Sequence, residues 1–580
     1  MSTKPLQLSS IDRDNLAAQI SNIWFTYNSQ RQPKIEQWKE LRNYIFATDT
    51  TTTTNKSLPW KNSTTLPKLC QIRDNLHSNY LSALFPNDEW LKWEGYSKSD
   101  GIKTKVNTIT AYMANKARES HFRREVSKLI YDYIDYGNAF AMPEFEASYA
   151  INTRNEKTPR YIGPKAIRIS PLDIVFNPLS SSFKDSWKII RSVITVGELA
   201  RKLQDNPEDN YLKDAINKRT QLLKKAGQYG IENSDKADGF QIDGFGNFYD
   251  YLQSGYVEML TFYGDIHNAD TGEFETDQII TIIDRCWVIS QRKFDNWFGA
   301  APIYHVGWRS RPDNLWSMGP LDNLVGMQYR IDHLENLKAD AMDLAIMPPL
   351  VIKGEVEQFQ WGPGVEIHLD ENGDVQELAK GAQWVVQADN NIDRLEMRME
   401  QYAGAPREAM GIRSPGEKTA FEIRELQNAA GRIFQEKLNT FELELLEPLL
   451  NGMLELGRRN MDQSDWIRVL DDDLGVTQFM EITKEDITAS GKLRPIGARH
   501  FAAQSQMIQN LTQISNTPIW QQIAPHTSTL QIAKMVEDLL GFSRYQVFRP
   551  NVGVTEGGDT ARLQNQVSED IMVENSAPLQ

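Results

Sequence analysis

The chain has 580 residues, and at about 150 residues per domain it should form several lobes around separate cores. Its 63 Lys and Arg residues against 78 Asp and Glu residues give a formal net charge of −15, which excludes a uniformly basic protein that coats nucleic acid. Hydrophobic residues make up 40% of the chain, with 14 Trp among them, which excludes disorder along its whole length.

Residue types that usually carry out chemistry are scattered along the chain. The two cysteines, Cys70 and Cys286, provide no disulfide framework and no thiolate cluster, which favours a reducing compartment. No two histidines lie within one helical turn of each other, and Gly491-Lys492-Leu493 lacks the rest of a phosphate-binding loop. We therefore expect no catalytic residue, no metal site and no cofactor.

The acidic run Asp471–Asp473 is the feature that most favours an enzyme. Adjacent aspartates point in different directions, so a metal ion would need further ligands from elsewhere in the chain. We interpret the run as a solvated acidic loop. A nucleic-acid enzyme with dispersed carboxylates stays open as an alternative, and it predicts cleavage that depends on a divalent metal.

Nothing in the sequence resembles a membrane anchor. The first residues show no basic segment followed by an apolar stretch. The most apolar short window, 345–352, is broken by two prolines and is far shorter than the ~20 residues that a membrane-spanning helix needs. We expect no contact with a membrane.

Helices dominate the predicted N-terminal part. Apolar residues at helical spacing cover 12–46, and the interruption near Gln32-Pro33 predicts two helices. A third helix is predicted after Pro67, with its end at Phe85-Pro86. Ile109 to Met142 also shows a helical pattern, which closes in Asp135-Tyr136-Gly137-Asn138.

Strand patterns follow in the chain. Short extended segments are predicted at 167–169 and 173–176, and apolar runs predict strands between Tyr256 and Ile289. A charged amphipathic segment lies between them, at about 193–225. Everything up to about Ser310 is expected to be one mixed α/β lobe.

The pattern changes again after Gly319-Pro320. Apolar residues repeat every three, four or seven positions up to Met347-Pro348-Pro349, which predicts a helix of about 26 residues and ~39 Å. A second helix should return from Asn391 to about Tyr402. Three short strands are predicted between these helices: Leu350–Ile352, Val365–Leu369 and Val375–Leu378.

A loop rich in Gly and Pro precedes a long helical pattern that begins at Thr419 and continues for roughly nine turns. Pro448 removes one backbone hydrogen bond from it and should bend this helix without ending it. A strand at 479–483 and helices at 499–514 and 530–540 are predicted next, before a polar and loose tail.

This order of parts, from about Gln37 to Leu540, resembles the portal protein of tailed double-stranded DNA bacteriophages. The segments that carry the resemblance are Ala345–Val351, Gly362-Pro363-Gly364, and Glu417–Arg424 continuing to Glu444–Leu449. Trp60-Lys61-Asn62 and Leu84-Phe85-Pro86 look like portals of short-tailed phages.

The resemblance implies a multi-domain α+β fold with long stem helices, a small β clip, a mixed α/β wing and a helical crown. The segments expected from it are the wing (1–318 and 419–497), stem helix 1 (319–347), the clip (348–387), stem helix 2 (388–404), the tunnel loop (405–418), the crown (498–545) and a flexible C-terminal tail (546–580).

The resemblance also implies a non-enzymatic ring, usually of twelve copies, at one capsid vertex of the virion, assembled in the host cytoplasm. Its channel would conduct double-stranded DNA during packaging and ejection. The implied partners are the terminase large subunit, whose ATP would supply the energy, a head-tail adaptor protein, and the major capsid or scaffolding protein. Another structural ring or adaptor protein of a phage stays open as an alternative.

Basic residues gather near the proposed channel, and some of them are candidates for weak contacts with DNA phosphates. These candidates are Arg394, Arg398, Arg407, Arg413 and Lys418. Arg394 and Arg398 could instead pair with Glu396 and Glu400 on the same helix.

Two aromatic residues of the predicted clip, Phe359 and Trp361, are candidates for docking a tail adaptor or the packaging motor, because aromatic anchors dominate interfaces. Packing between clip subunits is the simpler explanation, and we favour it, because such residues are often buried.

Overall fold

The computed structural model describes 6–8, 13–46, 62, 64–86, 90–96, 100–151, 157–205, 210–229, 255–268, 272–294, 301–346, 350–353, 374–377, 382–403, 433–461, 465–470, 477–488 and 490–495. These residues form both helices and strands, as expected for an α+β protein. The chain divides into two compact units, Met1–Leu81 with Ser120–Leu456, and Ser82–Glu119 with Gly457–Gln580. This division cuts across the single N-terminal lobe that was expected up to Ser310.

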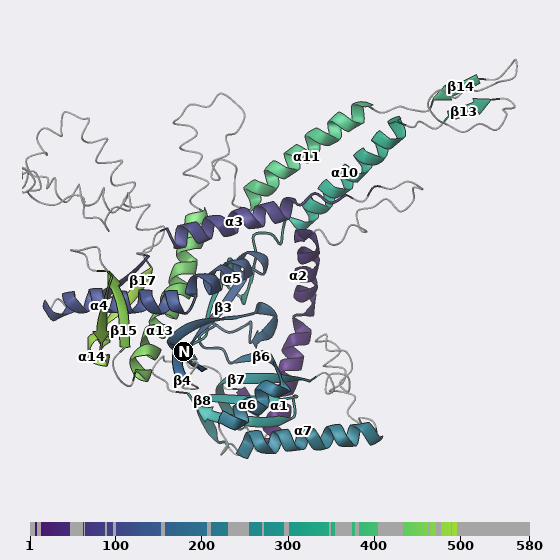
Figure 1. The fold of residues 1–580 in the computed structure, drawn as a ribbon. Helices are drawn as coiled ribbons and strands as arrows, with labels where there is room; N and C mark the ends of the chain where they lie inside the picture. Colours follow the sequence, from purple (N-terminus) through teal and green to yellow (C-terminus); the bar gives the residue numbers. More distant parts are fainter. Residues whose placement is uncertain are drawn as a thin grey trace, which may run out of the picture. The chain divides into compact units, whose positions relative to one another are not determined.

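The largest sheet of the first unit has six strands (Figure 1). Five of them pair in the order β5 (Ile174–Phe176), β6 (Lys188–Thr195), β7 (Tyr256–Asn268), β8 (Phe274–Ile283) and β9 (Trp287–Lys293). These neighbours are antiparallel, and β1 (Leu6–Leu8) pairs in parallel with the last residues of β7. The strands predicted between Tyr256 and Ile289 are confirmed.

Helices cover both faces of this sheet. Leu260 points into a core with α1 (Arg13–Gln30), whereas Met259 points into a core with α6 (Val196–Asp205) and α7 (Asn210–Tyr229). The two neighbours belong to different cores because successive side chains of a strand point to opposite faces. The amphipathic segment predicted at 193–225 is therefore two helices, and its first residues belong to β6.

A second sheet joins β10 (Tyr304–Gly307), β3 (Asn138–Ile151) and β4 (Lys157–Ile169), in that order. Ile35 and Trp38 of α2 (Gln32–Ile45) pack into an aromatic core beside it with Phe140, Phe176, Phe183 and Trp316. The predicted break between α1 and α2 is confirmed, and Pro33 lies in the first turn of α2, where a missing amide proton costs no helical hydrogen bond.

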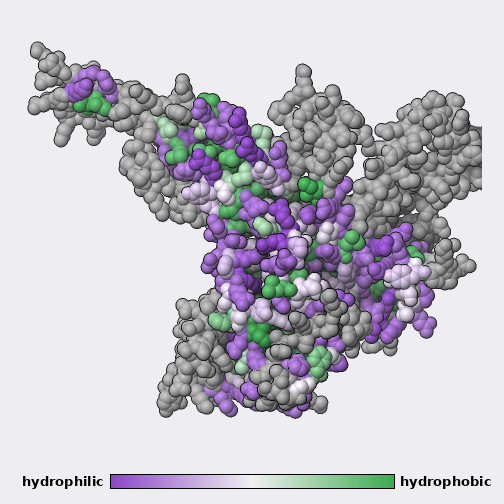
Figure 2. Space-filling model, turned by 180° about the vertical axis from the view of Figure 1, so that it is seen from behind, coloured by the Kyte–Doolittle hydropathy of each residue, from purple (hydrophilic) through white to green (hydrophobic). Residues whose placement is uncertain are grey.

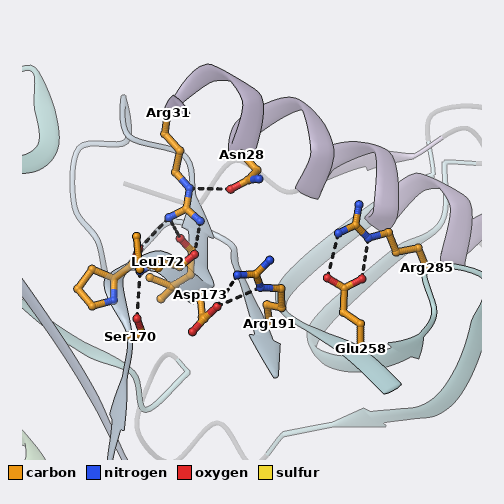
Figure 3. A network of polar contacts seen from close by, with 10 residues as sticks. Asn28, Arg31, Ser170, Leu172, Asp173, Arg191, Glu258 and Arg285 are labelled. Carbon is orange, nitrogen blue, oxygen red and sulfur yellow. Dashed lines mark hydrogen bonds and ion pairs between the residues drawn. The ribbon is translucent and has the colours of Figure 1, made fainter. Parts of the chain in front are cut away.

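Arg31, between α1 and α2, holds the chain that leads into β5 (Figure 3). Its Nη1 donates hydrogen bonds to the carbonyl oxygens of Pro171 and Ile174, both at 2.8 Å, and its Nη2 donates to the carbonyl oxygen of Leu172. Its Nε donates to Asn28 Oδ1 at 3.0 Å. One buried side chain therefore satisfies three backbone carbonyls that would otherwise lose their hydrogen bonds to water.

The single helix predicted from Ile109 is wrong in one respect. α4 (Asp100–Glu119) ends before α5 (Phe122–Asp135) begins, because His121 takes a left-handed backbone conformation with φ 55°. The end of α5 at Asp135 agrees with the predicted close at Asp135-Tyr136-Gly137-Asn138, and Asn138 starts β3. Gly137 makes this turn at φ 68°, where a Cβ atom would lie 2.3 Å from the backbone nitrogen of Gly319.

The second unit contains α4 and two strand pairs. β2 (Leu91–Gly95) pairs antiparallel with β17 (Gly491–Pro495), and β15 (Asp465–Leu470) pairs antiparallel with β16 (Thr477–Ile482). The strand predicted at 479–483 is thus confirmed and starts slightly earlier. Lys105 of α4 donates hydrogen bonds to the carbonyl oxygens of Glu485 and Thr488, next to α14 (Lys484–Ile487).

The long helix continues past Pro448, as expected. A π-helical turn, Glu442–Leu446, leads directly into α13 (Glu447–Asn460). Pro448 has no amide proton to donate to the carbonyl of Glu444, and a π-helical turn is a common way to accommodate such a gap in the hydrogen-bond ladder. The predicted start at Thr419, the crown (498–545) and the tail (546–580) lie outside the described residues.

Within the described ranges, no helix is both long enough and apolar enough to cross a membrane.

Candidate functional site on the helical hairpin

α10 (Val325–Ile346) and α11 (Ala382–Tyr402) lie side by side as an antiparallel pair (Figure 1). Between them in the chain, β13 (Leu350–Lys353) pairs antiparallel with β14 (Asp374–Glu377). We call α10, α11 and this strand pair the hairpin. Lys338 links its two helices through an ion pair with Asp389 (Nζ–Oδ1 2.9 Å). With 22 residues, α10 is about 33 Å long.

Both helices differ from their predicted bounds at one end. α10 starts at Val325, not at Leu321, because residues 321–324 form a turn in which Asp322 accepts a hydrogen bond from the backbone of Gly319 (2.9 Å). α11 starts at Ala382, so 382–387 is helical although it was predicted as part of the β clip. Contacts with α10 outweigh the β preference of the two valines in this stretch.

A buried polar stripe runs along α10. Gln328, Asp332, Asn336 and Asp340 follow one another at intervals of four residues, and each is at most 3% exposed. Residues at this spacing share one helix face. All four face a segment that consists of Asn62, 64–67 and the first two residues of α3 (Lys68–Leu84), which we call the strap.

The stripe accepts hydrogen bonds from the backbone of the strap. The four bonds are Leu69 N to Gln328 Oε1 (3.2 Å), Leu66 N to Asp332 Oδ1 (2.9 Å), Thr64 N to Asn336 Oδ1 (2.7 Å) and Asn62 N to Asp340 Oδ1 (2.9 Å). Gln328 also donates to the carbonyl oxygen of Leu66 (2.6 Å). Helix side chains thus satisfy partly buried backbone groups that a neighbouring strand would satisfy in a sheet. They also fix which face of α10 meets the strap.

Lys68 connects the strap to the second helix of the hairpin. Its side chain is 6% exposed, and its Nζ lies 2.6 Å from Glu400 Oε1 and 3.3 Å from Glu396 Oε2, both on α11. Breaking such a buried pair leaves an uncompensated charge in a low-dielectric environment. The strap therefore contacts α10 through its backbone and α11 through Lys68.

Asp332 is the stripe residue with the most perturbed ionisation. Burial raises the pKa of its carboxyl to about 6, although hydrogen bonds from Leu66 and Gln328 oppose this shift. Both of these bonds end on Oδ1, and the buried Oδ2 has no hydrogen-bond partner among the described residues. A protonated carboxyl fits this environment better than a carboxylate does.

We expect the strap to be held more tightly at acidic pH. Because the pKa of Asp332 is higher in the folded protein than in the unfolded chain, its stabilising contribution is complete below about pH 4 and is lost as the pH rises to about 6. Hydrogen exchange at the Leu66 amide, corrected for its intrinsic rate, should show protection that falls across this range. Asp332→Asn should abolish the fall, and Asp393→Asn, an exposed change on α11, should not. Identical profiles for all three proteins would contradict this account.

Arg394 and Arg398, two of the predicted DNA contacts, are exposed on α11. The alternative was that they pair with Glu396 and Glu400. In the described part of the chain neither guanidinium pairs with a carboxylate, and those two glutamates bind Lys68 instead. Among the described residues, no carboxylate therefore competes with an anion for either arginine.

The other predicted site residues cannot be placed. Arg407, Arg413 and Lys418 of the predicted tunnel loop lie outside the described residues, as do Phe359 and Trp361 of the predicted clip. The same holds for Asp471–Asp473. Among the residues that are described, no group of three or more His, Cys, Asp or Glu side chains is arranged to hold a metal ion.

The sequence prediction missed the strap and the stripe. The spacing of Gln328, Asp332, Asn336 and Asp340 was visible in the sequence, but four polar residues on one face of a helix normally indicate a solvent-exposed face. Only the structure shows that a segment from far along the chain covers them.

The amino-acid sequence matches no protein-family model and none of the curated proteins with which it was compared.

Proposed function

We propose that the chain is the subunit of a portal ring of a tailed double-stranded DNA bacteriophage, a non-enzymatic channel for DNA at one vertex of the capsid. The observation that carries the proposal is the hairpin. It has two helices of 22 and 21 residues, a short strand pair between them in the chain, and the buried polar stripe along α10. A hairpin of this kind supports the stem and clip that the sequence resemblance implies.

A rigid hairpin suits a ring because each copy must present two different faces to its two neighbours, and the ring closes when the rotation per copy divides a full turn. The helices of the hairpin carry exposed apolar side chains among polar ones. Figure 2 shows such a mixture of hydrophobic (green) and hydrophilic (purple) residues on the face of the molecule that it draws. The exposed apolar side chains of the hairpin are Tyr329, Leu337, Met342, Ile346, Val386, Met397 and Tyr402. Neighbouring copies would cover them.

The charge of the chain suits a channel that conducts DNA without retaining it. Each copy adds a formal charge of −15, so an assembled ring repels a polyanion over most of its surface. Exposed arginines such as Arg394 and Arg398 would add local, salt-screened contacts with phosphates. DNA would then move past weak contacts against a repulsive background.

In this proposal the strand pair at the end of the hairpin belongs to the region that docks the terminase large subunit during packaging and a head-tail adaptor protein afterwards. The ring would start capsid assembly by binding the major capsid or scaffolding protein. The energy for DNA movement would come from the ATP of the motor.

Neutralising the arginines of α11 should impair DNA handling and leave assembly intact. Arg394→Gln with Arg398→Gln removes two exposed charges per copy that have no carboxylate partner among the described residues, so the fold should be unaffected. We expect heads with shortened or poorly retained genomes, measured as packaged DNA length. Arg201→Gln on α6, also an exposed arginine, is the matched control. Full-length, stably retained genomes in the double variant would show that these two arginines do not contact DNA in the channel.

The assembly state tests the proposed function itself. Native mass spectrometry of the purified protein should give a closed oligomer with a mass near twelve times that of the 66.4 kDa chain. A monomer or dimer at every protein concentration would contradict it, and DNA cleavage on addition of a divalent metal would favour an enzyme.

A further inference from the structure

A cavity of the first unit lies where α2, the turn after β5 and the start of α10 meet. Its volume is about 980 Å³, at the upper end of the range in which proteins bind drug-sized ligands. Its walls also include β11 (Arg309–Arg311) and β12 (Asn314–Met318).

The inner wall of the cavity is apolar and partly flat. Trp316 and Phe176 stack with their ring centroids 4.7 Å apart, and Leu41 and Val175 extend this wall. Leu179, which is 77% exposed, adds further apolar surface to the lining. These residues offer a surface for an apolar, partly flat body.

Two cations border the same cavity. Lys34 Nζ donates a hydrogen bond to the carbonyl oxygen of Ser317 (2.9 Å), which leaves two of its three N–H groups for other acceptors. Arg311 is exposed on β11. Within the described residues neither forms an ion pair, and the nearby carboxylate of Asp322 already accepts a hydrogen bond from Gly319.

The pKa of Lys34 reflects the groups around it. Burial is the main cause that lowers the pKa of its ammonium group; Asp322 raises it, and Arg311 lowers it again. The cavity is also lined by Arg31 and by one further carboxylate, Glu40, which is exposed on α2. The lining thus holds three cations and two carboxylates, and a bound anion would relieve the repulsion between Lys34 and Arg311.

From this geometry we infer that the cavity binds an organic anion, with its apolar body against Trp316 and its anionic group between Lys34 and Arg311. Such a ligand would touch α2, the β11–β12 pair and the first turn of α10 together. The inference goes beyond the proposed function and does not depend on ring formation.

The probe for the test is 8-anilinonaphthalene-1-sulfonate, which combines a flat apolar body with one anionic group and fluoresces when it leaves water. We expect saturable binding at one site per full-length chain. N-phenyl-1-naphthylamine, which has the same body without the sulfonate, should bind at least about tenfold more weakly, as expected for loss of a charge-assisted hydrogen bond.

Two variants locate the site. Lys34→Met should weaken binding of the sulfonate about tenfold and leave binding of the neutral probe unchanged. Gly326→Phe should block both probes, because Gly326 lines the cavity and a Cβ atom there meets nothing within 4 Å, so the added ring can enter the cavity without disturbing α10. Arg42→Met, an exposed change on α2 outside this lining, is the control.

The pH dependence of binding tests whether the charge of Lys34, and not only the shape of the cavity, determines the affinity for the sulfonate. Affinity for the sulfonate should fall as the pH rises through the lowered pKa of Lys34, and Lys34→Arg should remove this fall because a guanidinium stays charged. Urea midpoints confirm that each variant is folded. Unchanged affinity in Gly326→Phe would show that the probes bind elsewhere. Equal binding of the two probes, or no effect of Lys34→Met, would show that the cavity does not select an anionic group.

Discussion

Arg31→Met is expected to lower the free energy of unfolding of the first unit by about 3 to 5 kcal/mol. The change removes the donors to the carbonyl oxygens of Pro171, Leu172 and Ile174 and leaves these groups without hydrogen bonds beside an aromatic core. Each buried polar group that loses its partner costs about 1 to 3 kcal/mol. Urea denaturation followed by tryptophan fluorescence measures the loss.

Two further variants show whether geometry or charge matters at this position. Arg31→Lys keeps the positive charge but cannot place donors on three carbonyls at once, so it should recover only part of the loss. Arg42→Met changes an exposed arginine of α2 and should have almost no effect on stability. If Arg31→Met were as stable as Arg42→Met, the three carbonyls would have other donors, and the role given to Arg31 would be wrong.

The second large effect is expected at the buried ion pair between Glu258 of β7 and Arg285 (Figure 3). Glu258 accepts two hydrogen bonds from the guanidinium, at 2.7 and 2.9 Å, and both side chains are at most 2% exposed. Arg285→Met leaves the carboxylate buried without this partner and should cost about 3 to 5 kcal/mol. The measurement is again the free energy of unfolding in urea.

A double-mutant cycle separates the contribution of the ion pair to the free energy of unfolding from the cost of leaving one of its charges unpaired. Glu258→Leu with Arg285→Met replaces both charges by apolar groups, and it should recover most of the stability that the single change loses. A double variant as unstable as the sum of its single changes would show that the two side chains act independently.

Local patterns predicted many of the elements correctly. The break at Pro33 and the end of α3 (Lys68–Leu84) at Phe85-Pro86 appear where expected, because proline acts within its own turn and needs no distant partner. The end of α10 was found in the same way, immediately before Met347-Pro348-Pro349. These features depend on a few neighbouring residues, which a single sequence contains.

Features that depend on distant partners were missed. The start of α11 at Ala382 follows from its packing against α10, and its valines alone favour a strand. The pairing of β2 with β17, which brings 82–119 into the second unit, joins segments from opposite ends of the chain, and a periodic pattern cannot name such a partner.

The candidate site was predicted only in part. The two helices of the hairpin and the strand pair between them follow the sequence prediction, whereas the strap and the cavity beside Lys34 do not appear in it. A helix face rich in Gln, Asp and Asn is interpreted as solvent-exposed as long as the segment that covers it is unknown. A cavity assembled from α2, β12 and α10 has no local pattern at all.

Electron micrographs of the purified protein seen along its axis test the central claim most directly. The account predicts rings of identical copies around an open centre wide enough for double-stranded DNA, with the hairpins of neighbouring copies side by side. Particles without a central opening, or single compact chains at every concentration, would contradict it.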